Sequence, residues 1–159
     1  MKKFSILVFF SCIAFISLAS YRQSKDEAMA NLYVVFAGAS TNFNHLDSIA
    51  KNISAKTGIK YETDLVYDNK RGMILPDTSS DDIYAGSYYP RRYAEERISI
   101  EMAGYYKSGD LRDADSTMMT IVTGIFGEKK DAAVNLAKVK AVVPNAYMKR
   151  VKLYQGCMH

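Results

Sequence analysis

The densest group of side chains suited to ligand binding lies at residues 81–93, which read DDIYAGSYYPRRY. Tyrosine rings stack on the apolar faces of sugars, and guanidinium groups bond to hydroxyl groups or anions. The pattern predicts a saccharide or partner-protein site formed by Tyr84, Tyr88, Tyr89, Arg91, Arg92 and Tyr93. The alternative is a structural loop in which the arginines pair with the aspartates and the tyrosines cover the core.

The carboxylates and histidines of the chain favour binding over catalysis. Glycosidases need two carboxyl groups that face each other across a cleft, whereas Asp81–Asp82 and Glu95–Glu96 are adjacent pairs that we interpret as solvated loop charge. The two histidines, His45 and His159, form neither a metal-ligand cluster nor a Ser-His-Asp set. We therefore expect no enzymatic activity, no cofactor and no metal.

The first 19 residues have the layout of a secretory signal peptide. Two lysines precede an apolar run, Phe4–Leu18, and small residues precede the expected cleavage after Ala19. An apolar helix of about 15 residues spans roughly 22 Å, less than the ~30 Å hydrocarbon core, which disfavours a membrane anchor. Lipidation at Cys12 is the other alternative, although the residues after it stay apolar. We expect a periplasmic or secreted protein that contacts a membrane only through an uncleaved or lipidated presequence.

Composition predicts one globular domain after cleavage. The chain of 159 residues is 48% hydrophobic and 24% charged, which is typical of a globular protein. Loss of Lys2 and Lys3 lowers the net charge from +4 to +2. Because no dense Lys/Arg face is evident, we expect no nucleic-acid partner. Cys157 is the single cysteine of the mature chain, so it is a buried thiol, an intermolecular partner or part of a disordered terminus.

A weak internal repeat predicts the architecture. Leu32–Gly38 and Met118–Gly124 are runs of β-branched and aromatic residues that end at a glycine, a pattern typical of a strand meeting a turn. Aligning the two glycines sets an offset of 86 residues. The same ungapped offset aligns Ala50 with Leu136, Ile53 with Val139, Tyr61 with Tyr147 and Leu65 with Val151.

Each copy predicts a helix and then a second strand. Apolar residues recur every three or four positions from Leu46 to Ile53 and from Ala133 to Val139, as on one face of a helix. The strands that follow are expected at Ile59–Tyr67 and Ala146–Tyr154. Each half is therefore expected to be a β-α-β unit.

These halves predict an α+β fold. Residues 31–67 and 118–154 would form one sheet with both helices packed on one face, within a single domain at 31–156 that follows a linker at 20–30. The other face of the sheet would be free to bind a ligand. Residues 68–117 would form a helical and loop insertion between the halves.

The repeated strand, helix and tyrosine-bearing strand resemble the SPOR (sporulation-related repeat) domain. The second copy carries the resemblance from Ile121 to Lys149, and the first carries it in Tyr33–Ser40. The resemblance implies a βαββαβ fold, an exported location and binding of peptidoglycan glycan strands across the open sheet face. The family joins its halves by a short link, whereas here residues 68–117 intervene. This insertion could cover the sheet face and abolish glycan binding, or could build a different site.

Within the insertion, breakers predict a loop at Arg71–Ser80. Ala94–Tyr106 fits both a helix and an alternating strand, and the acidic pair that follows Tyr93 favours the helix, which we predict. An acidic connector is expected at Asp110–Ser116.

Taken together, the sequence predicts an exported envelope module that binds cell-wall glycan. The alternative is a protein-interaction or inhibitor module that uses the Tyr/Arg-rich insertion against another envelope protein. A small hydrolase that uses Asp81 or Asp82 is the weakest alternative, because suitably placed histidines are missing.

Overall fold

The structure is a computed structural model that describes residues 28–78, 83–109 and 117–156. Several predictions fall outside these ranges. They concern the signal peptide, Cys12, Cys157, His159, the pair Asp81–Asp82 and the connector at 110–116. Within the described ranges, no helix has both the length and the apolar character needed to cross a membrane.

The chain divides into two units. One consists of residues 31–153, and the other consists of the two flanking segments of the sequence. In the flanking unit, the N–H group of Gln155 donates to the carbonyl of Ala28 at 2.6 Å. Apart from the outer ends of the first and last strands, the features of the fold described below belong to the unit 31–153, and so does the whole candidate site.

The described residues combine strands and helices, which confirms the predicted α+β class. In chain order the elements are β1 (Met29–Ser40), α2 (Phe43–Thr57), β2 (Val66–Asp68), β3 (Gly72–Ile74), β4 (Ser99–Met102), α3 (Ala103–Ser108), β5 (Met119–Phe126), α4 (Lys129–Lys140) and β6 (Tyr147–Tyr154). Four strands form one sheet in the order β4-β5-β1-β6, and β2 and β3 form a separate two-stranded sheet.

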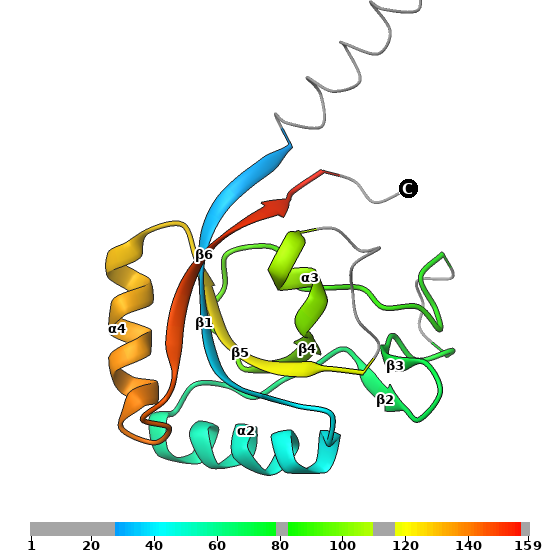
Figure 1. Ribbon diagram of the computed structural model, residues 1–159, viewed down its shortest axis with the longest axis horizontal. Coiled ribbons are helices and arrows are strands. Elements are labelled where there is room, and N and C mark those ends of the chain that lie inside the picture. Colours follow the sequence, from blue (N-terminus) through cyan, green and yellow to red (C-terminus); the bar gives the residue numbers. More distant parts are fainter. Residues whose placement is uncertain (1–27, 79–82, 110–116, 157–159) are drawn as a thin grey trace, which may run out of the picture. The chain divides into compact units, whose positions relative to one another are not determined.

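The main sheet is built around β5, which is buried along nearly its whole length. This strand pairs antiparallel with β1 on one side and with β4 on the other. The connection from β5 through α4 to β6 passes over β1, so β5 and β6 form a split βαβ unit (Figure 1).

Helices α2 and α4 cover one face of this sheet. α2 begins at the cap residue Asn42, whose side chain accepts a hydrogen bond from the N–H of His45 at 3.1 Å, and it ends at Gly58 with φ of +74°. Its apolar stripe is buried against β4 and β5. The core on this face includes Leu46, Ala50, Ile53, Ile100, Met102, Met119, Ile121 and Val139.

The repeat is visible in the positions of these elements. β1 and β5 both end two residues beyond the aligned glycine, at Ser40 and Phe126. The next helix begins three residues later in both halves, at Phe43 and Lys129. The offset of 86 residues is therefore kept from the first strand into the helix of each half.

The prediction of a strand at Ile59–Tyr67 is wrong. Only Tyr61 makes a β-bridge, parallel to Ile98, and the end of the segment belongs to β2, which pairs with β3. Ile59 and Leu65 are nevertheless buried. Both side chains enter the core, although the segment that carries them does not join the main sheet. β4, from the insertion, occupies the edge position beside β5.

Two predictions within the insertion are also wrong in part. The loop expected at Arg71–Ser80 contains β3. The helix expected at Ala94–Tyr106 is instead β4 followed by the short helix α3, which ends at Ser108. A strand forms at 99–102 because apolar and polar side chains alternate there, and each kind suits one face of the sheet. Ile100 enters the core on the helix side, and its polar neighbours point to the other face.

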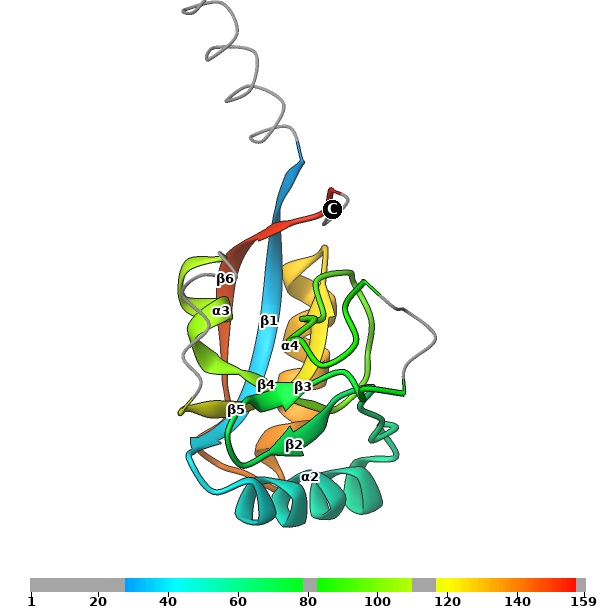
Figure 2. The same ribbon diagram turned by 90° about the vertical axis from the view of Figure 1, so that its right-hand side faces the viewer.

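The face of the sheet opposite α2 and α4 is not open over β4, β5 and β1. The views in Figures 1 and 2 place α3 on the opposite side of the sheet from α4. Tyr106 of α3 is buried and meets Phe36 of β1 with ring centroids 5.8 Å apart. Tyr88 also reaches this face, where its hydroxyl group meets Glu101 of β4. The insertion therefore covers this part of the sheet face, and its own residues form the surface there.

Candidate functional site

The candidate site is a cavity of about 320 Å³ between the insertion and the segment before β2. One wall of the cavity consists of polar and aromatic side chains, and the other consists of charged side chains. The lining residues include Thr63, Asp64, Leu65, Leu75, Tyr89, Pro90, Arg91, Arg92, Tyr93, Glu95, Arg97, Ser99 and Glu101. Its volume lies at the lower end of the roughly 300–1,000 Å³ typical of small-molecule sites.

The start of the aromatic wall is fixed by a turn that returns the chain to the end of β3. Leu75 donates its N–H to the carbonyl of Ser87 at 2.9 Å and accepts from the N–H of Gly86 at 3.0 Å. Gly86 has φ of +73°, a conformation that side-chain-bearing residues rarely adopt. Beside it, Arg71 binds both carboxylate oxygens of Asp77, at 2.9 and 3.0 Å.

The end of the wall is pinned to the sheet. Glu95 and Ile125 exchange backbone hydrogen bonds of 2.8 and 3.0 Å, as in an antiparallel bridge. Ile98 accepts from the N–H of Glu62 and donates to the carbonyl of Lys60. The residues between these anchors are therefore held at both ends.

Tyrosine rings and one arginine form the aromatic wall. The guanidinium carbon of Arg92 lies 5.4 Å from the ring centroid of Tyr89 and 5.1 Å from that of Tyr93, in cation–π range. Arg92 also donates to the Tyr89 hydroxyl at 2.8 Å. Tyr84 packs on the Tyr89 ring with a centroid distance of 4.7 Å. Arg92 is buried, whereas Tyr93 is exposed at the rim.

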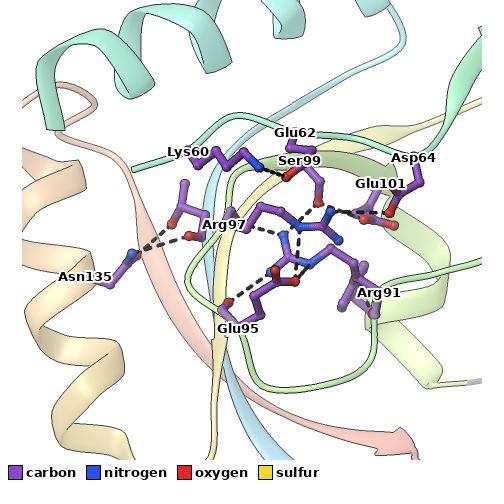
Figure 3. A network of polar contacts seen from close by, with 11 residues as sticks. Lys60, Glu62, Asp64, Arg91, Glu95, Arg97, Ser99, Glu101 and Asn135 are labelled. Carbon is purple, nitrogen blue, oxygen red and sulfur yellow. Dashed lines mark hydrogen bonds and ion pairs between the residues drawn. The ribbon is translucent and has the colours of Figure 1, made fainter. Parts of the chain in front are cut away.

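Arg91 anchors the charged wall through three hydrogen bonds to oxygen atoms of the chain (Figure 3). Its Nη1 donates to the carbonyl of Arg97 at 2.6 Å and to the Oγ of Ser99 at 3.0 Å. Its Nη2 donates to the carbonyl of Glu95 at 3.0 Å. In addition, the hydroxyl group of Tyr106 donates to the carbonyl of Arg91 at 2.7 Å. The guanidinium position is thus set by backbone and serine oxygens.

Glu101 is a buried carboxylate on the same wall. One of its oxygens accepts from Ser99 Oγ at 2.8 Å, and the other accepts from the Tyr88 hydroxyl at 3.0 Å. Burial raises the pKa of Glu101, against the opposing effects of the Arg91 charge and of these hydrogen bonds. Burial also raises the pKa of Tyr88, and the Glu101 charge adds to that shift. The hydroxyl of Tyr88 therefore stays protonated and serves as a donor.

The outer part of the charged wall is an ion-pair network around Arg97. Its Nε lies 3.1 Å from a carboxylate oxygen of Glu95, and its Nη1 lies 3.3 Å from one of Asp64. The same Glu95 oxygen lies 3.8 Å from Nε of Arg91. One rim carboxylate therefore faces two guanidinium groups (Figure 3).

The predicted site residues divide into two groups. Tyr89, Arg91, Arg92 and Tyr93 line the cavity, Tyr84 supports it through the Tyr89 ring, and Tyr88 packs against the core. The predicted pairing of these arginines with Asp81 and Asp82 lies outside the described residues. The lining residues that the sequence did not single out include Asp64, Arg97, Ser99 and Glu101.

The other charged and imidazole side chains considered for catalysis do not converge. Glu96 turns to α4, where it accepts from Asn135 Nδ2 at 3.1 Å and from Lys138 Nζ at 3.2 Å, and these bonds lower its pKa. Glu95 faces the cavity instead. His45 is exposed in the first turn of α2. Among the described side chains, no group of three or more His, Cys, Asp or Glu residues could hold a metal ion.

Comparison of the chain with known protein families, with curated proteins and with solved structures finds no match. The resemblance to the SPOR family therefore stays a prediction. A fold by itself does not determine an activity, so the chemistry of the cavity lining decides which ligand the protein suits.

Proposed function

We propose that this protein is an exported binding module of the cell envelope that holds a short saccharide segment of cell-wall glycan in the cavity. The proposal of export depends on the signal-peptide layout of residues 1–19. Its test is the amino-terminal sequence of the protein recovered from the culture, which is expected to begin at Ser20.

The observation that carries the proposal is the composition of the cavity walls. Tyr89 and Tyr93 offer apolar ring surface for the C–H face of a sugar. Asp64, Glu95 and the arginines offer acceptors and donors for its hydroxyl groups. An aromatic surface opposite charged hydrogen-bonding groups suits a saccharide better than it suits a fully apolar ligand.

Binding without turnover is favoured by the partners of the acidic side chains. Glu101 is held by Ser99 and Tyr88, and Glu95 is held between Arg91 and Arg97. The two carboxyl groups of a glycosidase have to act directly on the scissile bond, whereas both of these carboxyl groups are engaged by side chains of the protein itself.

Sedimentation with purified peptidoglycan tests the proposal. The wild-type protein is expected in the pellet, and Tyr93→Ala is expected to weaken binding by roughly three- to tenfold because the exposed ring is removed. Tyr67→Ala is the matched control, because Tyr67 is a partly exposed tyrosine outside the cavity. A wild-type protein that stays in the supernatant would contradict the proposal.

Capture of another envelope protein is the second candidate function. Ile83 is 74% exposed and Tyr93 is 54% exposed, and both belong to the insertion. Exposed apolar side chains of this kind are common at protein interfaces. Ile83→Ser is expected to abolish partner capture in a pull-down while glycan sedimentation is unchanged. Loss of glycan binding in the same variant would argue against two separable surfaces.

A further inference from the structure

In the charged wall of the cavity, the arginine side chains are far less exposed to solvent than the carboxylate side chains. The side chains of Arg91 and Arg97 are 9% and 13% exposed, whereas those of Glu95 and Asp64 are 50% and 68% exposed. The cations therefore lie inside and the anions lie at the rim. A rim carboxylate can turn into water at small cost, because exposed ion pairs contribute little to stability. The buried guanidinium groups cannot do the same.

The two buried guanidinium groups also have unused donors that face one position. Nε of Arg91 and Nε of Arg97 are buried and make no hydrogen bond in the described part of the chain. They lie 3.8 and 3.1 Å from the same oxygen of Glu95. The pair is thus close enough for charge attraction, but its geometry leaves both N–H donors unsatisfied. Buried unsatisfied donors of this kind often mark the position of a ligand or a water molecule.

The arginines would stay in place if the Glu95 carboxylate moved away. Arg91 is fixed by the carbonyl groups of Glu95 and Arg97 and by Ser99 Oγ, none of which belongs to that carboxylate. The backbone of Arg97 is fixed by the bridge that its neighbour Ile98 makes. The Arg91 side of the site for an anion is therefore preorganised, Arg97 keeps its ion pair with Asp64, and the present occupant is loosely held.

We propose that the cavity takes a carboxylate-bearing saccharide, whose carboxylate replaces that of Glu95 between Arg91 and Arg97. This inference depends on the proposed saccharide function and names the class of sugar. Two donors from separate guanidinium groups would bind both oxygens of the carboxylate, and such charge-assisted hydrogen bonds are stronger than neutral ones. The tyrosine wall would hold the sugar ring.

Two monosaccharides of cell-wall glycan provide the test, because they differ only in a lactyl ether carboxylate. N-acetylmuramic acid is expected to bind at least about fivefold more tightly than N-acetylglucosamine in an NMR titration, since only its carboxylate reaches the arginines. Free D-lactate is expected to bind more weakly than the acidic sugar. If D-lactate binds as tightly, the site takes small carboxylates and the saccharide part is overturned.

Removal of the rim anion gives the sharper result. Glu95→Gln is expected to raise the affinity for N-acetylmuramic acid by about two- to fivefold, the gain from releasing one exposed ion pair, and to widen its advantage over N-acetylglucosamine. Asp64→Asn is expected to act in the same direction through Arg97. Asp131→Asn, at an exposed position on α4, is the matched control and is expected to change neither affinity.

The outcomes separate this inference from the proposed function. Equal affinity for both sugars, or no gain in Glu95→Gln and Asp64→Asn, would overturn the carboxylate preference and leave saccharide binding intact. Binding of neither sugar by a protein that also fails to sediment with peptidoglycan would overturn both. Arg97→Gln is expected to abolish the preference for the acidic sugar, and retention of the preference would exclude this arginine from the site.

Discussion

Replacement of Tyr88 by phenylalanine tests how the insertion is attached to the sheet. The Tyr88 hydroxyl donates to Glu101 at 3.0 Å and accepts from the N–H of Met102 at 3.1 Å. Tyr88→Phe keeps the ring and removes both hydrogen bonds. It leaves a buried carboxylate oxygen with one donor fewer and a backbone N–H without its acceptor.

The expected cost follows from these two orphaned groups. A buried polar group that loses its partner costs about 1–3 kcal/mol, so two give roughly 2–6 kcal/mol of unfolding free energy. The lower end applies if a water molecule enters from the cavity, which Glu101 also lines. With a urea m-value of about 2 kcal/mol/M, the unfolding midpoint falls by roughly 1–3 M.

Urea unfolding of the mature protein at neutral pH, followed by circular dichroism, measures this change. Tyr67→Phe is the matched control, since its ring stacks on Phe43 and its hydroxyl makes no hydrogen bond among the described residues. The control is expected to lose less than about 0.5 kcal/mol. If Tyr88→Phe is no less stable than Tyr67→Phe, the hydroxyl does not join the insertion to β4 and the account of the covered face is wrong.

Three further perturbations have defined outcomes in the same unfolding assay. Burial raises the folded-state pKa of Glu101 above the ordinary value of 4.5, so its contribution to stability is complete at lower pH and is lost as the pH rises through the folded-state pKa. Glu101→Gln is expected to flatten this decline of stability with pH. An unchanged pH profile in the variant would contradict the raised pKa. Gly86→Ala places a Cβ 2.5 Å from a carboxylate oxygen at a positive φ and is expected to cost about 1–3 kcal/mol, whereas Gly127→Ala, with no atom within 4 Å, is expected to be nearly neutral. Asn135→Ala removes a fully buried amide that bonds β5 to residue 96 and is expected to cost roughly 2–3 kcal/mol, against less than 0.5 kcal/mol for the exposed Asn145→Ala.

The repeat could be predicted from the sequence because it depends on local patterns. A β-branched run, a glycine and an apolar helical stripe specify β1 and α2. The same patterns mark β5 and α4, but the stripe predicted from Ala133 is wrong in part, because α4 buries Ala132, Asn135 and Val139 while Ala133 is exposed. The strand predicted at Ile59–Tyr67 could not be decided in this way. Alternating apolar residues also suit an extended segment that packs on a core without joining the sheet. Which segment joins the sheet depends on competition with β4, more than thirty residues away in the sequence.

The aromatic half of the cavity was predictable, and the charged half was not. Tyr89, Arg92 and Tyr93 lie close together in the sequence, so composition alone marks them. Arg97 and Asp64 are brought together by the bridge between Tyr61 and Ile98, which no local pattern indicates. Buried Glu101 could have been suspected from its position between Ile100 and Met102, since a polar residue that alternates with core residues faces the opposite side of a strand.

The insertion decides which surfaces of this protein are open to a ligand. In a sheet made of two equivalent halves, the face without helices is the natural binding surface. Here β4 from the insertion is a strand of the sheet, and α3 and Tyr88 cover the face beside it. The exposed polar-aromatic surface therefore lies on the segment between the turn after β3 and the Glu95–Ile125 bridge. A scaffold that contains two such strand-helix units can therefore present a site away from the helix-free face. Variants of the cavity are thus the informative ones, because they change binding while the repeat keeps its core.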